Sequence, residues 1–257
     1  MADVLKPSSL IKRSFLYRIH EKAGGVFIEE NGFAVPSNYG QSVREEITLA
    51  HQMGIADLSH VSRTGFKGWH AASWLEKKNC KFGLESNFSY LQSTGERILR
   101  LSPNEFAIVG KIVNDRDFIT ELNSSLHPET DEGVFIVPRS DTNCWLKVMG
   151  VNAPSMLAKV CAVDLRPQIF PDGAIAQTNI ARLNCIVTRH DVGLATTYDI
   201  LTDCASADYF WQALLDAMDE FSGKTIVVVL PDLAERYLSS AMFEAVPTGI
   251  IEPPVIT

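Results

Sequence analysis

The sequence predicts an α+β fold in which one unit of strands and helices is present twice. A segment that begins at Arg63 (RTGFKGWHAASWLEKK) reappears 82 residues later, at Trp145, as WLKVMGVNAPSMLAKV. At this offset the identical pairs are Gly68 and Gly150, Ala71 and Ala153, Ser73 and Ser155, Leu75 and Leu157, and Lys77 and Lys159. The ILRL run at 98–101 likewise aligns with IARL at 180–183. Repetition at a fixed spacing indicates an internal duplication, although any α+β chain shows some echo of strand, glycine and helix.

Each copy has the local patterns of a strand, a helix, a hairpin and a second helix. Ser42, with Glu45 three residues later, is typical of a capping box at a helix start, and Gly54 ends the helical pattern. The Ser-Pro-Asn segment at 102–104 is typical of a tight turn, because proline fixes φ and asparagine can close the turn. The expected elements are helices over 42–53, 71–78, 115–122 and 209–221 and strands over 60–66, 98–101 and 106–109. We therefore expect mixed antiparallel sheets flanked by helices, with a ligand site in the groove between the halves.

On this interpretation the chain has three parts. Residues 1–14 form a loosely held N-terminal arm, 15–222 form one domain, and 223–257 form a strand–helix tail. The domain contains two similar halves, at about 55–125 and 137–222.

Composition removes several functional classes. Of the 257 residues, 46% are hydrophobic and 21% are charged, which is ordinary for a folded globular protein. The 23 Lys and Arg residues against 31 Asp and Glu give a net charge of −8. This balance argues against a nucleic-acid surface, because such surfaces need clustered basic residues. No apolar run approaches the roughly 18 residues of a membrane span, and the N-terminus lacks a secretory apolar segment.

The histidines and cysteines argue against a metal site and against disulfides. The six histidines show no HExxH or HxH spacing, and the five cysteines are scattered without a CxxC pair. An odd number of scattered cysteines is typical of reduced thiols in a cytoplasm. We therefore expect a cytoplasmic protein with no nucleic-acid partner, no membrane segment and no metal.

The stretch 20–68 resembles the N-terminal part of a known family. The matching positions are His20, Gly25, Gly32, Pro36, Tyr39-Gly40, Glu46, Gly54, Asp57-Leu58-Ser59-His60 and Gly68. They are spread over the whole stretch, so the pattern is more specific than one short motif. The family is that of the glycine-cleavage T-protein, the aminomethyltransferases.

The later stretches 137–183 and 207–221 resemble the gamma subunit of heterotetrameric sarcosine oxidase. The likeness rests on Gly150, Ala153, Leu157, Val163-Asp164-Leu165, Phe170, Gly173, Gln177-Thr178 and Ala181. Both families share one folate-domain fold, so the resemblance over about 15–222 implies a duplicated, T-protein-like folate-binding domain. In the sarcosine oxidase family, other subunits oxidise an N-methyl amine on a flavin, and the methyl carbon passes to tetrahydrofolate.

The chain departs from the T-protein pattern at the positions that matter for catalysis. T-proteins use an aspartate of a Gly-Gly-x-x-Asp-Asp motif, where this chain reads Ser-Thr-Gly-Glu-Arg-Ile at 93–98. The pterin-facing asparagine is replaced around Gly110, and the glutamate of the Arg-Thr-Gly-Tyr-Thr-Gly-Glu motif has no counterpart in 187–193. The third domain of T-proteins is also missing from this sequence. The resemblance therefore implies the fold and the pathway, with a degraded catalytic site.

Five residues are candidates for contact with the folate, and no catalytic residue is assigned. Asp57 and His60 belong to the DLSH motif at 57–60, where His60 is either a proton carrier tuned by Asp57 or part of a closed turn. Tyr39 either contacts a ligand above the groove or packs. Glu96 is the carboxylate nearest to the catalytic position of the family. Tyr198 either stacks on a pterin, as a T-protein aromatic residue does, or fills the core.

The predicted function is that of a gamma-like accessory subunit in a multi-subunit, tetrahydrofolate-linked oxidase or demethylase of sarcosine-type amines. Its partners would be flavoprotein amine oxidase subunits of alpha and beta type, and flavin and NAD would be bound by those partners alone. Tetrahydrofolate is the one cofactor that this chain itself is a candidate to bind. Two alternatives stay open: a stand-alone tetrahydrofolate-dependent aminomethyl or methyl transferase, and a folate-domain module in RNA modification or iron–sulfur repair.

A second, local likeness lies in the tail. The stretch 223–244 (GKTIVVVLPDLAERYLSSAMFE) resembles the C-terminal strand and helix of cysteine synthases. The cofactor-bearing lysine and the phosphate-binding loop of those enzymes are absent from this sequence. We therefore interpret the tail as a docking or edge element.

Overall fold

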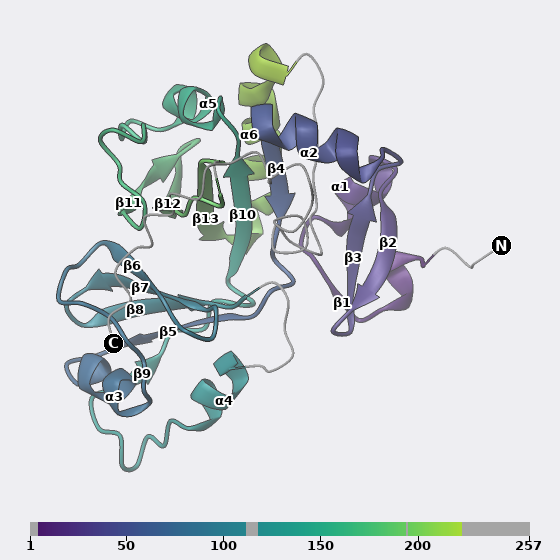
Figure 1. Cartoon of the computed structure of the whole chain (residues 1–257). Helices are drawn as coiled ribbons and strands as arrows, with labels where there is room; N and C mark the ends of the chain where they lie inside the picture. The colour runs from purple at the N-terminus through teal and green to yellow at the C-terminus, as the bar shows by residue number, and fades with distance from the viewer. Residues whose placement is uncertain (1–4, 112–117, 194, 223–257) are drawn as a thin grey trace.

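Three β-sheets and their helices make up the structure, which is a computed structural model (Figure 1). It describes residues 5–111, 118–193 and 195–222, with the backbone alone at 219–222. The cysteine-synthase-like tail at 223–257 lies outside the described residues. The predicted α+β class with antiparallel sheets and flanking helices is confirmed.

The N-terminal residues form a small unit of their own. A 3₁₀ turn at Pro7–Ser9 leads to a three-stranded sheet in the order β1-β3-β2, with one helix packed beside it. Its elements are β1 (Lys12–Arg13), α1 (Tyr17–Lys22), β2 (Val26–Glu30) and β3 (Phe33–Asn38). Because β1 pairs with β3 and Ser14 is buried, the end of the expected loose arm is in fact held in the fold.

The next helix confirms the predicted cap. It is α2 (Val43–Gln52), and Ser42 and Glu45 form the capping box in both directions. The chain then enters a strand at Gly54 instead of continuing the helix. A Cβ at Gly54 would lie 3.2 Å from the Cα of Ala50, so a side chain at this position would crowd the helix.

The remaining strands form two five-stranded sheets, which we name after their central strands. The β5 sheet has the order β6-β7-β8-β5-β9, and the β10 sheet has the order β11-β12-β13-β10-β4. The first comprises β5 (Arg63–Lys67), β6 (Phe88–Leu91), β7 (Arg97–Ser102), β8 (Glu105–Val109) and β9 (Phe135–Ile136). The second comprises β4 (Gly54–Asp57), β10 (Asn143–Met149), β11 (Ile175–Ile180), β12 (Leu183–Arg189) and β13 (Thr197–Asp203).

The two sheets have the same strand order and exchange their edge strands. β4 precedes β5 in the chain but pairs with β10, whereas β9 precedes β10 but pairs with β5. The repeated glycines occupy equivalent places: Gly68 follows β5 with a φ of 128°, and Gly150 follows β10 with a φ of 110°. A helix begins three residues after each. This correspondence supports the duplication, which stays an interpretation of the sequence.

Helices cover the outer faces of the two sheets, and their inner faces contact each other (Figure 1). The helices are α3 (Ala71–Lys77) and α4 (Phe118–Ser124) on the β5 sheet, and α5 (Ala153–Val160) and α6 (Ala207–Ser222) on the β10 sheet. Leu99 and Ala107 of the β5 sheet meet Trp145 and Leu201 of the β10 sheet in one buried cluster. The predicted groove between the halves is therefore filled by side chains at this point.

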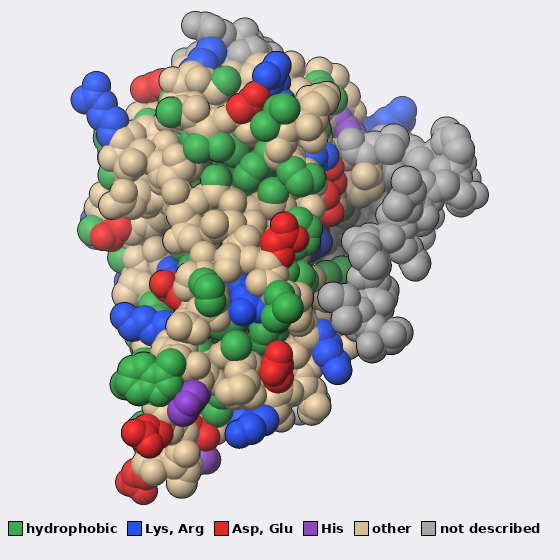
Figure 2. All heavy atoms as spheres, turned by 90° about the vertical axis from the view of Figure 1, so that its left-hand side faces the viewer, with side chains coloured by type: hydrophobic (Ala, Val, Ile, Leu, Met, Phe, Trp, Pro, Cys, Tyr) green, Lys and Arg blue, Asp and Glu red, His purple; other side chains and the backbone are tan. Residues whose placement is uncertain are grey.

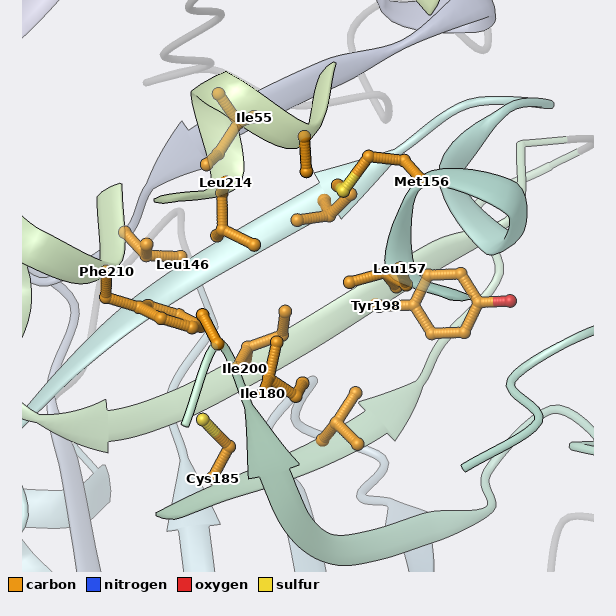
Figure 3. Close-up of a cluster of buried hydrophobic side chains, with 14 of the residues drawn as sticks. Ile55, Leu146, Met156, Leu157, Ile180, Cys185, Tyr198, Ile200, Phe210 and Leu214 are labelled. Carbon is orange, nitrogen blue, oxygen red and sulfur yellow. The ribbon is translucent and has the colours of Figure 1, made fainter. Parts of the chain in front are cut away.

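The larger core lies between the β10 sheet and its helices. Figure 3 shows Phe210 and Leu214 of α6 over the strands that carry Leu146 and Ile200. These four side chains are fully buried. Phe210 and Leu214 are four residues apart, so one face of the last helix closes this core.

The surface gives no large patch of one charge on the face in Figure 2, where acidic and basic side chains are interspersed. Within the described residues, no helix combines the length and the apolarity that crossing a bilayer requires. All five cysteines are free thiols, and four of them are buried. No set of three or more potential ligands in the described chain is arranged to hold a metal ion.

Candidate functional site

Three of the five predicted site residues come together where the N-terminal unit meets the β10 sheet. We call this group the junction cluster: Ser14, His20, Tyr39, Asp57 and His60. Asp57 is the last residue of β4 and points to the helix side of the sheet, because it pairs with the core residue Leu146. The cluster therefore joins segments that are far apart in the sequence.

Asp57 is the acceptor on which the junction cluster depends. His20 Nε2 lies 3.1 Å from Asp57 Oδ2, the Ser14 hydroxyl donates to the same oxygen, and the Ser59 N–H donates to Oδ1 at 2.9 Å. Burial alone would raise the pKa of this carboxyl, but His20 and the hydroxyl and amide donors outweigh it and hold the pKa at about 2. Asp57 is thus an ionised carboxylate although the residue is only 2% exposed.

His20 connects this carboxylate to a half-buried tyrosine. The Tyr39 hydroxyl lies 2.7 Å from His20 Nδ1. Burial, with Asp57 and Glu46 nearby, raises the pKa of Tyr39, so the phenol keeps its proton and can donate it to Nδ1. Since the carboxylate only accepts, His20 Nε2–H is the donor to Asp57. The Trp211 ring meets the His20 ring in a T-shaped contact, with 5.1 Å between the ring centroids, and completes the packing around His20.

His60, the fifth member of the junction cluster, lies beside this network, as does Glu46, whose carboxyl is close to the backbone of Tyr39. His60 Nε2 has no hydrogen bond in the described structure, and the nearest acidic oxygen, Glu30 Oε2, is 4.0 Å away. Burial lowers the pKa of His60 to about 4, helped by the positive charge of Arg63 and opposed by Asp57. Glu46 on α2 is 4% exposed, and its Oε1 has no partner among the described residues. Burial raises the pKa of this carboxyl.

A second polar group lies on the opposite face of the β10 sheet. We call it the central cluster: Arg97, Lys147, His190 and Asp199. Lys147 Nζ lies 2.7 Å from Asp199 Oδ1, the Trp145 indole N–H donates to the same oxygen at 2.9 Å, and His190 Nδ1 is 3.5 Å from Oδ2. Burial opposes ionisation of Asp199, but Lys147 and His190 hold its pKa far below the usual range.

The other two predicted residues lie elsewhere. Tyr198 faces the helix-side core, where its ring lies beside Leu157 and its hydroxyl donates to the carbonyl of Leu165 (Figure 3). Glu96 is 2% exposed and accepts from the Thr94 hydroxyl. It sits on the helix side of the β5 sheet, since the alternating neighbour Ile98 belongs to that core. Neither side chain reaches the junction cluster or the central cluster.

Sequence reasoning missed the central cluster and the role of His20. A signal was present, because Lys147 and Asp199 each interrupt an otherwise apolar strand, in WLKVM and TYDIL. A charged residue in a buried strand needs a partner of opposite charge, and the register places these two directly opposite each other. For His20 the match to the family pattern was visible, but its carboxylate partner is 37 residues away.

A family model described as GCVT N-terminal domain matches residues 96–227, a little over half of the chain. The chain belongs to the GCVT N-terminal domain family. Among curated relatives, the aminomethyltransferase of Desulforamulus reducens is 23% identical over 220 residues, covering 80% of this chain and 58% of that protein. This GCVT chain therefore spans less than two thirds of the relative's length.

Solved structures agree on the fold. A chain of the heterotetrameric sarcosine oxidase from Corynebacterium sp. U-96 superposes with a TM-score of 0.62 at 16% identity, covering 84% of this chain and 100% of that chain. Aminomethyltransferase T of the glycine cleavage system from Bartonella henselae gives a TM-score of 0.63 at 20% identity, and the match covers 80% of this chain and 57% of that chain. The predicted T-protein-like fold of this GCVT chain is confirmed.

The buried carboxylates of the two clusters are largely occupied by donors of this chain. A pterin offers ring N–H and amino donors, which need acceptors that are free. Both oxygens of Asp57 and both oxygens of Asp199 are already engaged by donors of this chain. Two surface cavities, of about 490 Å³ along α5 and about 280 Å³ on α2, are lined by other residues. Glu46 keeps a buried oxygen, Oε1, without a hydrogen-bond partner among the described residues.

Proposed function

We propose that this chain is a gamma-like accessory subunit of a multi-subunit, tetrahydrofolate-linked oxidase or demethylase of N-methyl amines such as sarcosine. The observation that carries the proposal is the superposition on a chain of heterotetrameric sarcosine oxidase over that chain's whole length. Aminomethyltransferase T is covered over 57% of its length. A match to one complete chain of an assembly supports a role in a similar assembly.

The folate site of this chain is degraded in our proposal. Asp57 and Asp199 are consumed by internal partners, Glu96 faces a helix-side core, and Leu99 and Trp145 fill the space between the sheets. Tetrahydrofolate then acts at another subunit. The net charge of −8 supports this assignment, because an acidic chain attracts anionic polyglutamyl folate poorly.

The partners in this proposal are flavoprotein amine oxidase subunits of alpha and beta type, which bind flavin and NAD. The test is purification of the tagged full chain from the organism that encodes it. We expect a flavin-containing partner in stoichiometric amount and hydrogen peroxide production that depends on an N-methyl amine. The same tag on an unrelated cytoplasmic protein of that organism is the control.

A stand-alone aminomethyltransferase is the alternative that the names of the curated relatives favour. Calorimetric titration of the isolated chain with tetrahydrofolate separates the two proposals. Micromolar affinity, together with aminomethyl transfer by the chain alone, would overturn the accessory role. If binding is seen, Glu96→Gln tests whether that carboxylate holds the pterin. We expect no effect on binding, because Glu96, just before β7, is buried on the helix side of the β5 sheet.

A further inference from the structure

The N-terminal unit carries a charge opposite to that of the whole chain. Residues 5–22 contain five Lys and Arg residues and one acidic residue, Glu21, whereas the chain has a net charge of −8. We call the clustered part of this charge the basic surface, which comprises Lys12, Arg13, Tyr17, Arg18 and Lys22. In Figure 1 the N-terminal unit lies to one side of the two five-stranded sheets.

The short helix α1 separates the basic surface from the buried junction cluster. His20 of this helix is fully buried, whereas Arg18 and Lys22 are exposed and, being four residues apart, share one face of the helix. Arg13 reaches the same helix from β1, because its guanidinium lies over the ring of Tyr17. The cations of the basic surface are therefore on the solvent side of the N-terminal unit.

Tyr17 brings two guanidinium groups together. Arg13 lies 4.6 Å and Arg18 lies 5.4 Å from the centroid of its ring, and Arg18 Nε donates to the Tyr17 hydroxyl at 2.9 Å. Lys12 precedes Arg13 on the edge strand β1, and its ammonium is 5.4 Å from the centroid of the Phe33 ring. Two like charges on one ring repel each other, and a negative group placed next to them offsets that repulsion.

The cations of the basic surface have no acidic partner among the described residues. Other basic groups of the described chain do form ion pairs, as Arg139 does with Glu105 and Arg166 with Asp164. The Tyr17 hydroxyl accepts from Arg18, so its own O–H can still donate. Guanidinium N–H groups and a phenol O–H are donors that a carboxylate accepts. The basic surface therefore offers both charge and hydrogen bonds to carboxylates from outside.

Exposed apolar side chains accompany the cations in the chain. Phe15, which lies between Arg13 and Tyr17 in the sequence, is 36% exposed, and Ile11, which precedes Lys12, is 96% exposed. Aromatic and arginine side chains are enriched at protein–protein interfaces, where apolar anchors lie within a polar rim. This composition favours a protein segment over a free small ion as the occupant.

The charge of the whole chain limits the size of that occupant. Exposed charges more than about 8 Å apart are largely screened at physiological ionic strength, so a short acidic segment interacts mainly with the cations directly below it. An extended polyanion, such as a nucleic acid or an anionic membrane, would also meet the acidic remainder of the chain. A short run of Asp and Glu residues therefore fits the basic surface better than a large anionic surface does.

We propose that the basic surface is a docking site for an acidic segment of a partner protein. Carboxylates of that segment pair with Arg13 and Arg18 through charge-assisted hydrogen bonds, and its apolar side chains pack on Phe15. The inference goes beyond the accessory role proposed above, because the surface selects a partner by charge, whatever reaction that partner catalyses. Its test is therefore independent of the purification of a flavin-containing partner.

The test is fluorescence anisotropy of a labelled peptide of Asp, Glu and Phe residues, titrated with the full chain. We expect saturable binding that weakens as salt is added. Arg13→Gln combined with Arg18→Gln should weaken the affinity at least about fivefold, because two charged pairs are lost. The control combines Lys77→Gln with Arg182→Gln, which removes the same charge from exposed positions elsewhere, and we expect it to bind as the wild type does.

Several results would overturn the proposal. They are no binding of the peptide at low salt, equal binding of a peptide with Asn and Gln in place of its acidic residues, an equal loss in the control variant, or tighter binding of RNA or of phosphatidylserine vesicles than of the acidic peptide. Should the variant with both arginines replaced fail to fold, carbodiimide coupling of the peptide to the wild type decides: the cross-links must form at Lys12 or Lys22 and not at Lys77.

Discussion

Asp57 and Asp199 are two buried carboxylates on opposite faces of one sheet, and they use different partners. Asp57 is 2% exposed and Asp199 is 3% exposed, and both keep their charge. Asp57 is bonded by Ser14 and His20 of the N-terminal unit, whereas Asp199 is held by a lysine directly opposite it on the neighbouring strand. The first carboxylate fastens one segment to another, and the second balances a charge within its own sheet.

The choice of partners explains why the hydrogen-bond network around Asp57 is complete, whereas the group around Asp199 includes a buried polar atom without a partner. Around Asp57 the network runs from Tyr39 through His20 to the carboxylate, and each of these groups has its partner. Around Asp199 the other half of the molecule adds the charge of Arg97, whose buried Nε has no hydrogen-bond partner in the described chain. One face of the sheet thus carries a closed hydrogen-bond network, and the other carries a buried ion pair with further positive charge near it.

The largest effect is expected at Asp57. Asp57→Ala leaves His20 and Ser14 buried without their acceptor, which costs about 3 to 5 kcal/mol of the free energy of unfolding. Urea unfolding at pH 7 measures the loss. Glu21→Ala, which removes an exposed carboxylate of the same N-terminal unit, should stay within about 0.5 kcal/mol of the wild type. A loss below about 1 kcal/mol at Asp57 would break the comparison, because the cluster would then not be an anchor.

A double-mutant cycle tests the central pair. Lys147→Met and Asp199→Asn each leave a buried group without its partner. The double variant should therefore lose less free energy of unfolding than the two single variants lose together, with a coupling energy of about 2 to 3 kcal/mol. The control cycle uses Arg166 and Asp164, an exposed pair that should couple by less than about 1 kcal/mol. Equal coupling in the two cycles would contradict the assignment of Lys147 as the partner of Asp199.

His60 gives a smaller effect that depends on pH. Its pKa in the folded protein is about 4, below the ordinary value of 6.5, so the unfolded chain binds a proton that the folded chain does not. The contribution of His60 to the free energy of unfolding is therefore fully present above about pH 6.5, and it is lost as the pH drops toward 4. Between pH 7.5 and pH 5 the loss from this group is about 2 kcal/mol.

The measurement for His60 is denaturant unfolding across this pH range. His60→Gln should lose about 2 kcal/mol less than the wild type over the same interval, because glutamine does not titrate. Parallel curves for the two proteins would mean that His60 is accessible to protons in the folded state, and the junction cluster would then be more open than its contacts indicate.

Parts of the fold followed from the sequence because their causes are local. The capping box at Ser42 and the hairpin at 98–109 depend on residues within a few positions of each other. The repeated Gly68 and Gly150, which the sequence aligns, lie at equivalent places where the backbone has positive φ before a helix. The candidate site was predicted in part: Tyr39, Asp57 and His60 belong to one cluster, whereas Glu96 and Tyr198 lie elsewhere.

Only the tertiary structure decided how distant segments pair. The alternation of side chains places Tyr198 and Asp199 on opposite faces of β13, but the sequence does not say which face meets the other sheet. The exchange of β4 and β9 between the sheets likewise leaves no local pattern. The sequence by itself determined the family, the elements and the duplicated pattern. Strand partners and the contacts of buried charges had to come from the tertiary structure, because they join residues far apart in the chain.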